Sequence, residues 1–348
     1  MSAASTGCLA RGSRVRRGAL AVALLVTGGC LADTRIAPSW PGTTLLVAED
    51  ASATLCELEP NGGRVRHRYP LFADCAAIAA GRSGEYAAAI RATGEVAVLD
   101  LGRYGVDARY AVAGAGRASG LAFVDRLTRL AAAFDGAGDV LVFGRESGRI
   151  EHAIPTGAAG VVALAAGHRS GELVAAVTSP DELVWLDADL GRVVRRVALP
   201  GRPAALARGS EAGGTWAIVA TDGGLRAWSE RRGILEALSG PAALAVAAEA
   251  GTAVASDAAS GAVLVWSAAG LTRIAVAEPD LTGAAWPIAV DPEGRNAFVA
   301  LRSSGRVAAV DLREGRVRGA YAPLAAPARV AWSLRRELPE GGAALDGR

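Results

Sequence analysis

The sequence predicts an all-β fold, a seven-bladed β-propeller with four antiparallel strands in each blade. Two observations support this prediction. A strand-like stretch of apolar residues recurs seven times at intervals of 38 to 44 residues, which is the period of propeller blades. Glycine and turn-forming pairs also recur every ~8–12 residues, so the Ala-rich segments cannot continue far as helices.

The recurring stretch is the third strand of each predicted blade. Its copies are TLCELEP (54–60), EVAVLDL (95–101), DVLVFGR (139–145), ELVWLDA (182–188), GLRAWSE (224–230), AVLVWSA (262–268) and RVAAVDL (306–312). The equivalent core positions are Leu58, Leu99, Phe143, Leu186, Trp228, Trp266 and Val310. Short apolar runs bounded by turns are typical of strands that are buried between neighbours.

Each copy has the same neighbours along the chain. A second strand precedes it, as in NAFVAL (296–301), and an outer strand follows it, as in RVRGAY (316–321). A short Ala-rich stretch, such as VVALAA (161–166), then leads into the next unit. We expect these stretches to be the innermost strands, because small side chains suit the crowded propeller axis.

The two ends of the repeat complement each other. The pattern begins with a second strand at residues 44–50 and finishes with a spare first strand at residues 328–334. Pairing of these strands would close the ring and protect two sheet edges. We therefore assign residues 44–336 to the propeller and expect residues 337–348 to form a disordered tail.

The N-terminus has the composition of an export signal. A basic segment, RGSRVRR (11–17), precedes an apolar segment, GALAVALLV (18–26), that is too short to span a bilayer. The following TGGC (27–30) resembles the lipobox of bacterial lipoproteins, which implies removal of residues 1–29 and a diacylglycerol on Cys30. Residues 30–43 would then be a linker. Plain secretion, with cleavage nearby, for example after Ala32, is the alternative.

The charge of the chain argues against nucleic acid as a partner. The formal net charge is +2, and residues 1–29 hold four Arg and no acidic residue, so the remainder carries −2. No later stretch reaches ~18 uninterrupted apolar residues, so we expect no transmembrane helix. We expect a monomeric propeller that reaches the membrane through its lipid anchor, on the periplasmic or outer side of the cell.

Two of the four cysteines would remain without a lipid after export. Cys8 lies in the predicted signal and Cys30 would carry the lipid, which leaves Cys56 and Cys75. In an oxidising compartment these two can form a disulfide, or they can stay as buried thiols. Both alternatives stay open, because the sequence gives no geometry.

Two units resemble the Tyr-Val-Thr-Asn (YVTN) repeats of bacterial propellers. They are IAVDPEGRNAFVALRSSGRVAAVDLREGRVRGAY (288–321) and VAAVTSPDELVWLDADLGRVVRRVALPGRPAALA (174–207). The resemblance covers residues 44–336 more loosely, and the family's signature Asn after the second strand is missing. It implies the propeller fold but leaves the activity open, since lactonase-like, quinoprotein-like, outer-membrane assembly and adhesin propellers share these turns.

The sequence contains no convergent catalytic set. His67 and His152 fall in predicted outermost strands and His168 falls in a turn, so they do not converge. No haem-attachment motif and no zinc-type Cys/His spacing is present. We therefore expect a protein that is not an enzyme, with no cofactor, no metal and no catalytic residue.

Charged residues recur in the turns between second and third strands and in the connections that lead into each blade. In a propeller, these two sets of loops lie at one end and surround the channel. We call the predicted ring of charges the charged rim; it comprises Asp50, Asp74, Arg91, Arg117, Asp135, Asp181, Arg202, Asp222, Asp257, Asp280, Arg302 and Arg329. Such residues cap turns and keep a surface soluble, or they form a recognition face, because loops on a rigid scaffold carry binding.

The longest of these connections, AEPDLTGAAWP (277–287), departs from the repeat and ends at Trp286-Pro287. Trp286 either anchors an interface on the charged rim or fills the channel as core. The whole pattern favours a lipid-anchored binding or scaffold module that presents the rim to an envelope protein. The alternatives are a lactonase-like or other small-molecule or metal-binding enzyme, and a subunit of a periplasmic redox or export complex.

Overall fold

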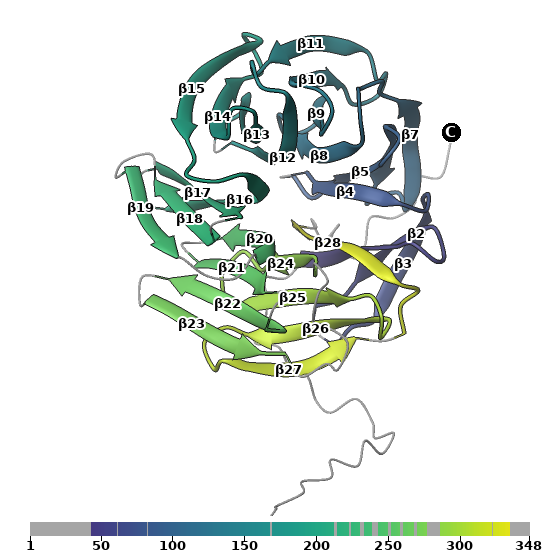
Figure 1. The fold of residues 1–348 in the computed structure, drawn as a ribbon. Coiled ribbons are helices and arrows are strands. Elements are labelled where there is room, and N and C mark those ends of the chain that lie inside the picture. Colours follow the sequence, from purple (N-terminus) through teal and green to yellow (C-terminus); the bar gives the residue numbers. More distant parts are fainter. Residues whose placement is uncertain are drawn as a thin grey trace, which may run out of the picture. The chain divides into compact units, whose positions relative to one another are not determined.

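The computed structural model describes residues 43–334 except 61, 82, 168, 212–213, 223, 230–232, 239–242, 250–251, 258–259, 268–269, 277–285 and 322. These residues belong to one compact unit, which spans residues 33–348. The described part contains 28 strands in seven four-stranded antiparallel sheets, which confirms the predicted seven-bladed β-propeller. Figure 1 shows the seven sheets arranged around a common centre.

Each blade contains one strand from each of four concentric layers. The innermost strands are β28 (Pro327–Leu334), β4 (Cys75–Ala80), β8 (Ala118–Phe123), β12 (Gly160–Ala166), β16 (Pro203–Glu211), β20 (Ala243–Glu249) and β24 (Ile288–Val290). The second strands are β1 (Thr43–Glu49), β5 (Tyr86–Arg91), β9 (Arg129–Phe134), β13 (Glu172–Thr178), β17 (Gly214–Thr221), β21 (Thr252–Asp257) and β25 (Asn296–Leu301).

The third strands coincide with the recurring stretch of the sequence. They are β2 (Thr54–Leu58), β6 (Glu95–Asp100), β10 (Asp139–Gly144), β14 (Glu182–Asp187), β18 (Gly224–Ser229), β22 (Ala262–Ser267) and β26 (Arg306–Asp311). The outermost strands are β3 (Val65–Pro70), β7 (Gly105–Ala111), β11 (Ile150–Pro155), β15 (Arg192–Ala198), β19 (Gly233–Leu238), β23 (Gly270–Ala275) and β27 (Arg316–Tyr321). We number the blades 1 to 7 from the one that contains β1.

The core lies between adjacent blades. The second strands β1 and β25 are buried along their whole length, whereas the outermost strand β15 is largely exposed. Along β14, Val184 and Leu186 pack toward blade 3, and Leu183 and Trp185 pack toward blade 5. Successive side chains of a strand point to opposite faces of the sheet. Both faces of a third strand are covered by neighbouring blades, which explains why its sequence is a continuous apolar run.

The ring closes as the sequence predicts. The last strand, β28, pairs antiparallel with β1, with Val330 opposite Val47 and Trp332 opposite Leu45. The Tyr321 hydroxyl on β27 also donates a hydrogen bond to the carbonyl of Pro60 in blade 1. Closure therefore removes the two sheet edges that the ends of the repeat would leave exposed.

Four predicted segments extend past the described residues or lie wholly outside them. The signal (1–29) and the tail (337–348) lie outside, and the linker (30–43) and the propeller (44–336) each extend past the described part at one end. His168 also lies outside the described residues. Within the described residues, no helix that could span a membrane is found.

Cys56 and Cys75 are both buried and both free, so the structure adopts the buried-thiol alternative and not the disulfide. They lie on β2 and β4, in different sheets. The Cys56 thiol donates to Glu49 Oε2 at 2.9 Å, and the Cys75 thiol donates to the carbonyl of Ala77 at 3.5 Å. Each sulfur thus has its own polar partner within its surroundings.

Candidate functional site

The charged rim includes a pocket of about 400 Å³. It lies where loops of blades 1, 2, 3 and 7 meet the inner strands around the channel. Six expected rim residues line it together, namely Asp50, Asp74, Arg117, Asp135, Arg302 and Arg329. The other lining residues are Cys75, Ala76, Ala118, Ser119 and Val162. We call this hollow the rim pocket.

Turn geometry fixes part of the rim pocket. The Asp135 carboxylate accepts a hydrogen bond from the backbone nitrogen of Arg117 at 2.7 Å, and the Asp135 backbone nitrogen donates to the Arg117 carbonyl at 2.9 Å. Asp222 and Arg202 repeat this arrangement in blade 5, with both distances at 3.1 Å. In each case the aspartate joins the turn after a second strand to the segment that leads into the same blade. The hydrogen bonds use only the backbone of the arginine, so the arginine side chain takes no part in them.

The arginines of the rim pocket differ in their partners. Arg302 on the β25–β26 turn forms an ion pair with Asp50 of blade 1 at 2.9 Å. Arg329 donates to the carbonyls of Ala76 and Ala328, both at 2.7 Å, which holds its guanidinium at the wall. Arg117 is exposed, and no carboxylate pairs with the Arg117 or the Arg329 side chain among the described residues.

Two acids complete the charge distribution. Asp74 is 70% exposed at its side chain and lies 4.0 Å from Arg91, a distance at which attraction through water is weak. Asp50 Oδ1 is buried, and it has no hydrogen-bond partner in the part of the chain that the structure describes. The pocket therefore offers two guanidinium groups and two carboxylates that are not fully compensated internally.

The Cys75 thiol forms part of the wall. Burial raises the pKa of Cys75 to about 12, against the effect of the nearby Arg329, which lowers it, and together with Asp50, which raises it. A thiol with this pKa stays protonated at neutral pH, and the thiolate is the nucleophilic form of cysteine. Cys75 is therefore a packing residue of the rim pocket.

The remaining rim residues that the structure describes lie outside the pocket. Asp181, Arg202 and Asp222 occupy turns at the same end of the propeller, and Arg91 ends β5. Asp257 is buried at 1% exposure and accepts a hydrogen bond from Ser260, so it stabilises its own turn. Asp280 lies outside the described residues.

Trp286 belongs to the core. It is 2% exposed and packs in the cluster between blades 6 and 7, against residues such as Val263 and Ile288. An interface anchor would need an exposed ring. The structure thus places Trp286 between two blades and not on the surface of the charged rim.

The histidines stay apart, as the sequence predicts for the two that are described. His67 lies on the outermost strand β3, where its ring contacts those of Tyr69 at 4.6 Å and Tyr104 at 5.1 Å. His152 lies on the outermost strand β11. Across the described ranges, no group of three or more His, Cys, Asp or Glu side chains is arranged to hold a metal ion.

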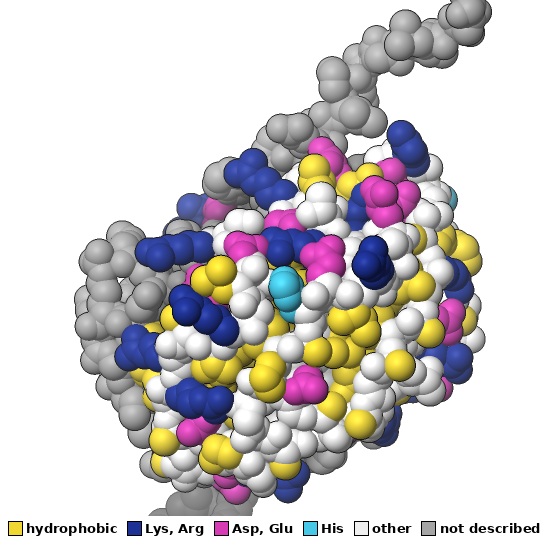
Figure 2. Space-filling model, turned by 90° about the horizontal axis from the view of Figure 1, so that it is seen from above, with side chains coloured by type: hydrophobic (Ala, Val, Ile, Leu, Met, Phe, Trp, Pro, Cys, Tyr) yellow, Lys and Arg dark blue, Asp and Glu magenta, His cyan; other side chains and the backbone are white. Residues whose placement is uncertain are grey.

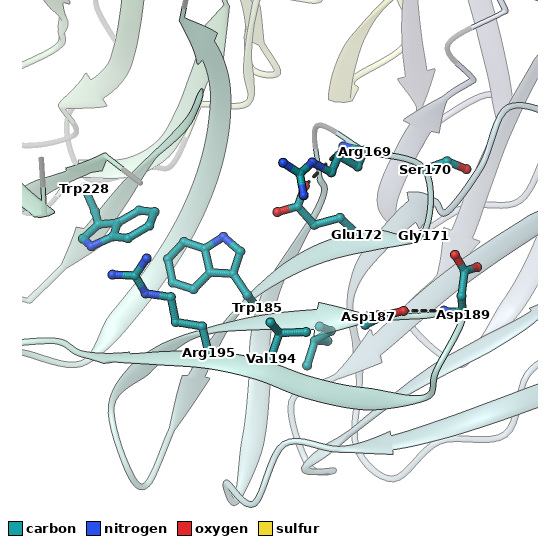
Figure 3. Close-up of a pocket in the computed structure, with 11 residues that line it drawn as sticks. Arg169, Ser170, Gly171, Glu172, Trp185, Asp187, Asp189, Val194, Arg195 and Trp228 are labelled. Carbon is teal, nitrogen blue, oxygen red and sulfur yellow. Dashed lines mark hydrogen bonds between the residues drawn. The ribbon is translucent and has the colours of Figure 1, made fainter. Parts of the chain in front are cut away.

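The structure also contains a second pocket, of about 260 Å³, that sequence reasoning missed (Figure 3). Its most distinctive residues are Trp185 on β14, Trp228 on β18 and Arg195 on β15. The sequence contains only a weak indication of this pocket, because Trp185 and Trp228 do not occupy equivalent positions of the blade repeat: Trp228 aligns with Leu186, the residue after Trp185. The two rings meet only because their blades are neighbours. We call this second pocket the tryptophan pocket.

The chain was compared with models of known protein families and with curated proteins, and neither comparison gives a match.

Proposed function

We propose that the chain is an exported, lipid-anchored propeller that binds a protein partner in the cell envelope through the charged rim. One observation carries the proposal. The rim pocket brings the guanidinium groups of Arg117 and Arg329 together with Asp50 and the exposed Asp74, although these residues come from blades 1, 2 and 3. The closed ring of blades is a rigid scaffold for these loops, and binding residues often lie on loops that a rigid scaffold positions.

The mixture of charges favours a protein as the ligand. Complementary charges at an interface raise the association rate and the specificity for a partner more than they raise the affinity. A rim with both signs exposed fits a surface that itself carries both signs, which is typical of proteins. A nucleic acid would instead favour a uniformly basic face.

The proposed location rests on the sequence. The basic segment, the short apolar segment and TGGC at residues 27–30 are the parts of a lipoprotein signal. A diacylglycerol on Cys30 would hold the propeller at a membrane surface without spanning it. The YVTN-like units at residues 174–207 and 288–321 support a bacterial propeller of this type.

The experiment is capture of the tagged full chain from its native envelope after mild crosslinking, read by mass spectrometry. Arg117→Glu and Arg329→Glu reverse charges in the rim pocket. Arg126→Glu is the matched control, because Arg126 is exposed at the opposite end of β8 from Arg117. The proposal predicts one stoichiometric partner that both rim variants lose and the control retains. Equal capture by all four proteins would contradict it.

A small-molecule or metal site at the channel mouth is the second candidate. The buried Asp50 Oδ1, which lacks a hydrogen-bond partner among the described residues, favours it. This alternative predicts metal in the purified protein, or hydrolysis of lactones, and the Asp50→Asn substitution should remove either one.

A third candidate is a subunit of a redox or export complex. The identity of a captured partner, or co-purified haem or quinone, would distinguish it from a simple scaffold.

A further inference from the structure

Both ends of the described chain lie at the end of the propeller opposite the charged rim. β1 begins at Thr43 and runs toward the rim turn that contains Asp50, and β28 runs from the rim to Leu334, which pairs with Thr43. The turns that follow first and third strands share this end, because the strands of each blade are antiparallel. We call these turns, with the strand ends that adjoin them, the terminal face.

The terminal face contains the exposed large apolar side chains of the described residues. They are Tyr104, Leu127, Ile150, Leu190, Val194 and Val317. Three of them lie in turns, and the other three lie within the first three residues of outermost strands that begin at this face. Single exposed apolar residues need no explanation. Here, however, all six lie at one end of the propeller, and none lies at the charged rim.

These apolar side chains are distributed over blades 2, 3, 4 and 7. Leu190 and Val194 of blade 4 are the most exposed, at 61% and 63%. Figure 2, seen from the side of the propeller where β11 and β15 lie, shows apolar side chains spread between Arg and acidic residues. The centre of a protein–protein interface is usually one packed apolar patch, whereas separate apolar side chains can each enter the interfacial layer of a bilayer.

Exposed arginines accompany the apolar side chains. In the described part, the turns of the terminal face contain six of them, namely Arg64, Arg103, Arg126, Arg149, Arg169 and Arg313. Arg103 lies 3.8 Å from Asp100, and the other five guanidinium groups form no ion pair with a carboxylate among the described residues. A guanidinium group binds phosphate oxygens well, often through two parallel hydrogen bonds. Phospholipid headgroups offer such phosphates.

Most acidic residues of the terminal face are engaged within the protein. In its described turns, the exposed acids each pair with an arginine; the pairs are Glu146 with Arg145 at 2.7 Å, Asp189 with Arg129 at 2.5 Å, and Glu314 with Arg316 at 2.5 Å. The half-buried Asp125 and Asp187 hold their turns by accepting backbone hydrogen bonds, at 2.7 Å from Thr128 and 3.0 Å from Leu190. Glu151 on β11 is exposed without an ion pair among the described residues of this face. An approaching surface would therefore meet mainly guanidinium groups and apolar side chains.

We propose that the terminal face docks on a phospholipid surface, with its apolar side chains in the interfacial layer and its arginines on headgroup phosphates. The inference rests on the proposed attachment through Cys30, but not on the proposed partner of the rim. Residues 31–42 join Cys30 to Thr43, and a segment of this length spans at most about 45 Å. A lipid on Cys30 would thus hold this face, and not the rim, next to the bilayer.

The attachment makes weak docking sufficient. A tether keeps the terminal face at a high effective concentration near the bilayer, so a few separate side chains can fix the orientation without a large contact area. In this orientation the charged rim points away from the membrane and is accessible to a protein partner.

The test measures which end of the propeller contacts lipid. The full chain is purified in detergent from its native envelope and reconstituted into vesicles of phosphatidylcholine and phosphatidylglycerol that contain a nitroxide-labelled lipid. A fluorescent amino acid replaces Leu127 in one protein and Ala115 in another, because these exposed positions lie beyond opposite ends of β8. We expect the nitroxide to quench fluorescence at position 127 at least about twofold more than at position 115.

Substitutions elsewhere on the terminal face locate the docking surface. Leu190→Asn combined with Val194→Asn should lower the quenching at position 127 at least about twofold, because it removes apolar surface that enters the bilayer. Both side chains are mostly exposed, so the core is unchanged. Ala198→Asn is the matched control, because Ala198 is exposed at the rim end of the strand that contains Val194. The control should leave the quenching unchanged.

Equal quenching at positions 127 and 115, stronger quenching at 115, or no effect of the double substitution would overturn the docking. The vesicles contain no other protein, so failure of the rim to bind a partner does not affect the result. A chain that does not sediment with the vesicles would contradict both the attachment and the docking. A protein that crosslinks to a photoreactive residue at position 127 in the native envelope, with no quenching in vesicles, would assign the terminal face to a protein instead.

Discussion

The carboxylate of Glu49 accepts a hydrogen bond from the backbone nitrogen of Ala325 at 2.7 Å, although 276 residues separate the two in the sequence. Glu49 ends β1 and is 1% exposed, and Ala325 lies in the loop between β27 and β28. The second oxygen of Glu49 accepts from Thr54 at 2.7 Å and from Cys56 at 2.9 Å. Closure of the ring therefore depends on a buried carboxylate as well as on the pairing of β28 with β1.

Replacement of this carboxylate should weaken the folded state. In Glu49→Gln, the amide has one acceptor oxygen and places its NH₂ group against hydrogen-bond donors, so we expect a loss of about 2 kcal/mol in the free energy of unfolding. Urea unfolding followed by circular dichroism measures it. Glu314→Gln is the control, because Glu314 is half-exposed and pairs with Arg316 at the surface. That variant should change stability by less than about 0.5 kcal/mol.

The same residue predicts how stability depends on pH. Burial alone would raise the pKa of Glu49, but hydrogen bonds from Cys56, Thr54, the Ala325 backbone nitrogen and Ser52 outweigh it and lower the pKa to about 2. A carboxyl whose pKa is lower in the folded than in the unfolded state stabilises the fold fully above its unfolded value, near 4.5. This stabilisation is lost as the pH falls from there toward 2.

We therefore expect the free energy of unfolding of the wild type to decline between about pH 5 and pH 2. Asp125, whose pKa also lies at about 2 because hydrogen bonds from Arg129 and Thr128 outweigh burial, contributes in the same direction. Unfolding titrations at several pH values should show a shallower decline for Glu49→Gln. Identical slopes in the two proteins would show that Glu49 does not titrate as its contacts predict.

Two neighbouring glycines, Gly62 and Gly63, allow a direct test of how closely blade 1 packs against blade 7. Gly63 has a φ of +67°, and a Cβ added there would lie 2.1 Å from the Tyr321 ring on β27. Gly62 has a φ of +101°, and a Cβ there would meet nothing within 4 Å. Gly62→Ala should cost about 1 kcal/mol through backbone strain alone.

Gly63→Ala should cost roughly 2 kcal/mol or more, because it adds a collision with Tyr321 to the same kind of strain. Thermal and urea unfolding of both variants measure the difference. Equal destabilisation would mean that blade 1 and blade 7 do not pack as closely as the structure shows.

The strand pattern could be predicted because it depends on local chemistry. Apolar runs, Gly-rich turns and the period near 42 residues indicate strands, and the spare strand at residues 328–334 predicts closure. The buried residues Leu58, Leu99, Phe143, Leu186, Trp228 and Val310 fall where the repeat places them. The side chain of Trp266 lies outside the described part.

Contacts between blades could not be predicted in the same way. The rim pocket is lined by Asp50, Arg117 and Arg302, which come from different blades. The period of the repeat indicates which loops lie at the same end of the propeller, but it does not indicate which of their side chains lie close together. Asp257 and Trp286 are surface candidates by position, yet one is buried in its own turn and the other between two blades. The stacking of Arg195 on Trp228 joins two blades that no local signal relates.

The state of the cysteines is open to direct measurement. Burial, together with a hydrogen bond to Glu49, raises the pKa of Cys56 to about 12, and burial raises that of Cys75 to the same value. We expect both thiols to resist iodoacetamide in the folded protein and to react with it in urea without a reductant. Peptide mass spectrometry distinguishes the outcomes. A linked peptide that contains Cys56 and Cys75 would contradict the structure.

The measurement that tests the central claim most directly is site-specific photo-crosslinking in the native envelope. A photoreactive amino acid replaces Arg117 in one protein and Arg126 in another, so that the probes lie at opposite ends of β8. The account predicts that one partner protein crosslinks from position 117 and not from position 126, with the same mass in repeated preparations. Crosslinks from position 126 alone, equal crosslinks from both positions, or none from either would contradict a protein-binding role for the charged rim.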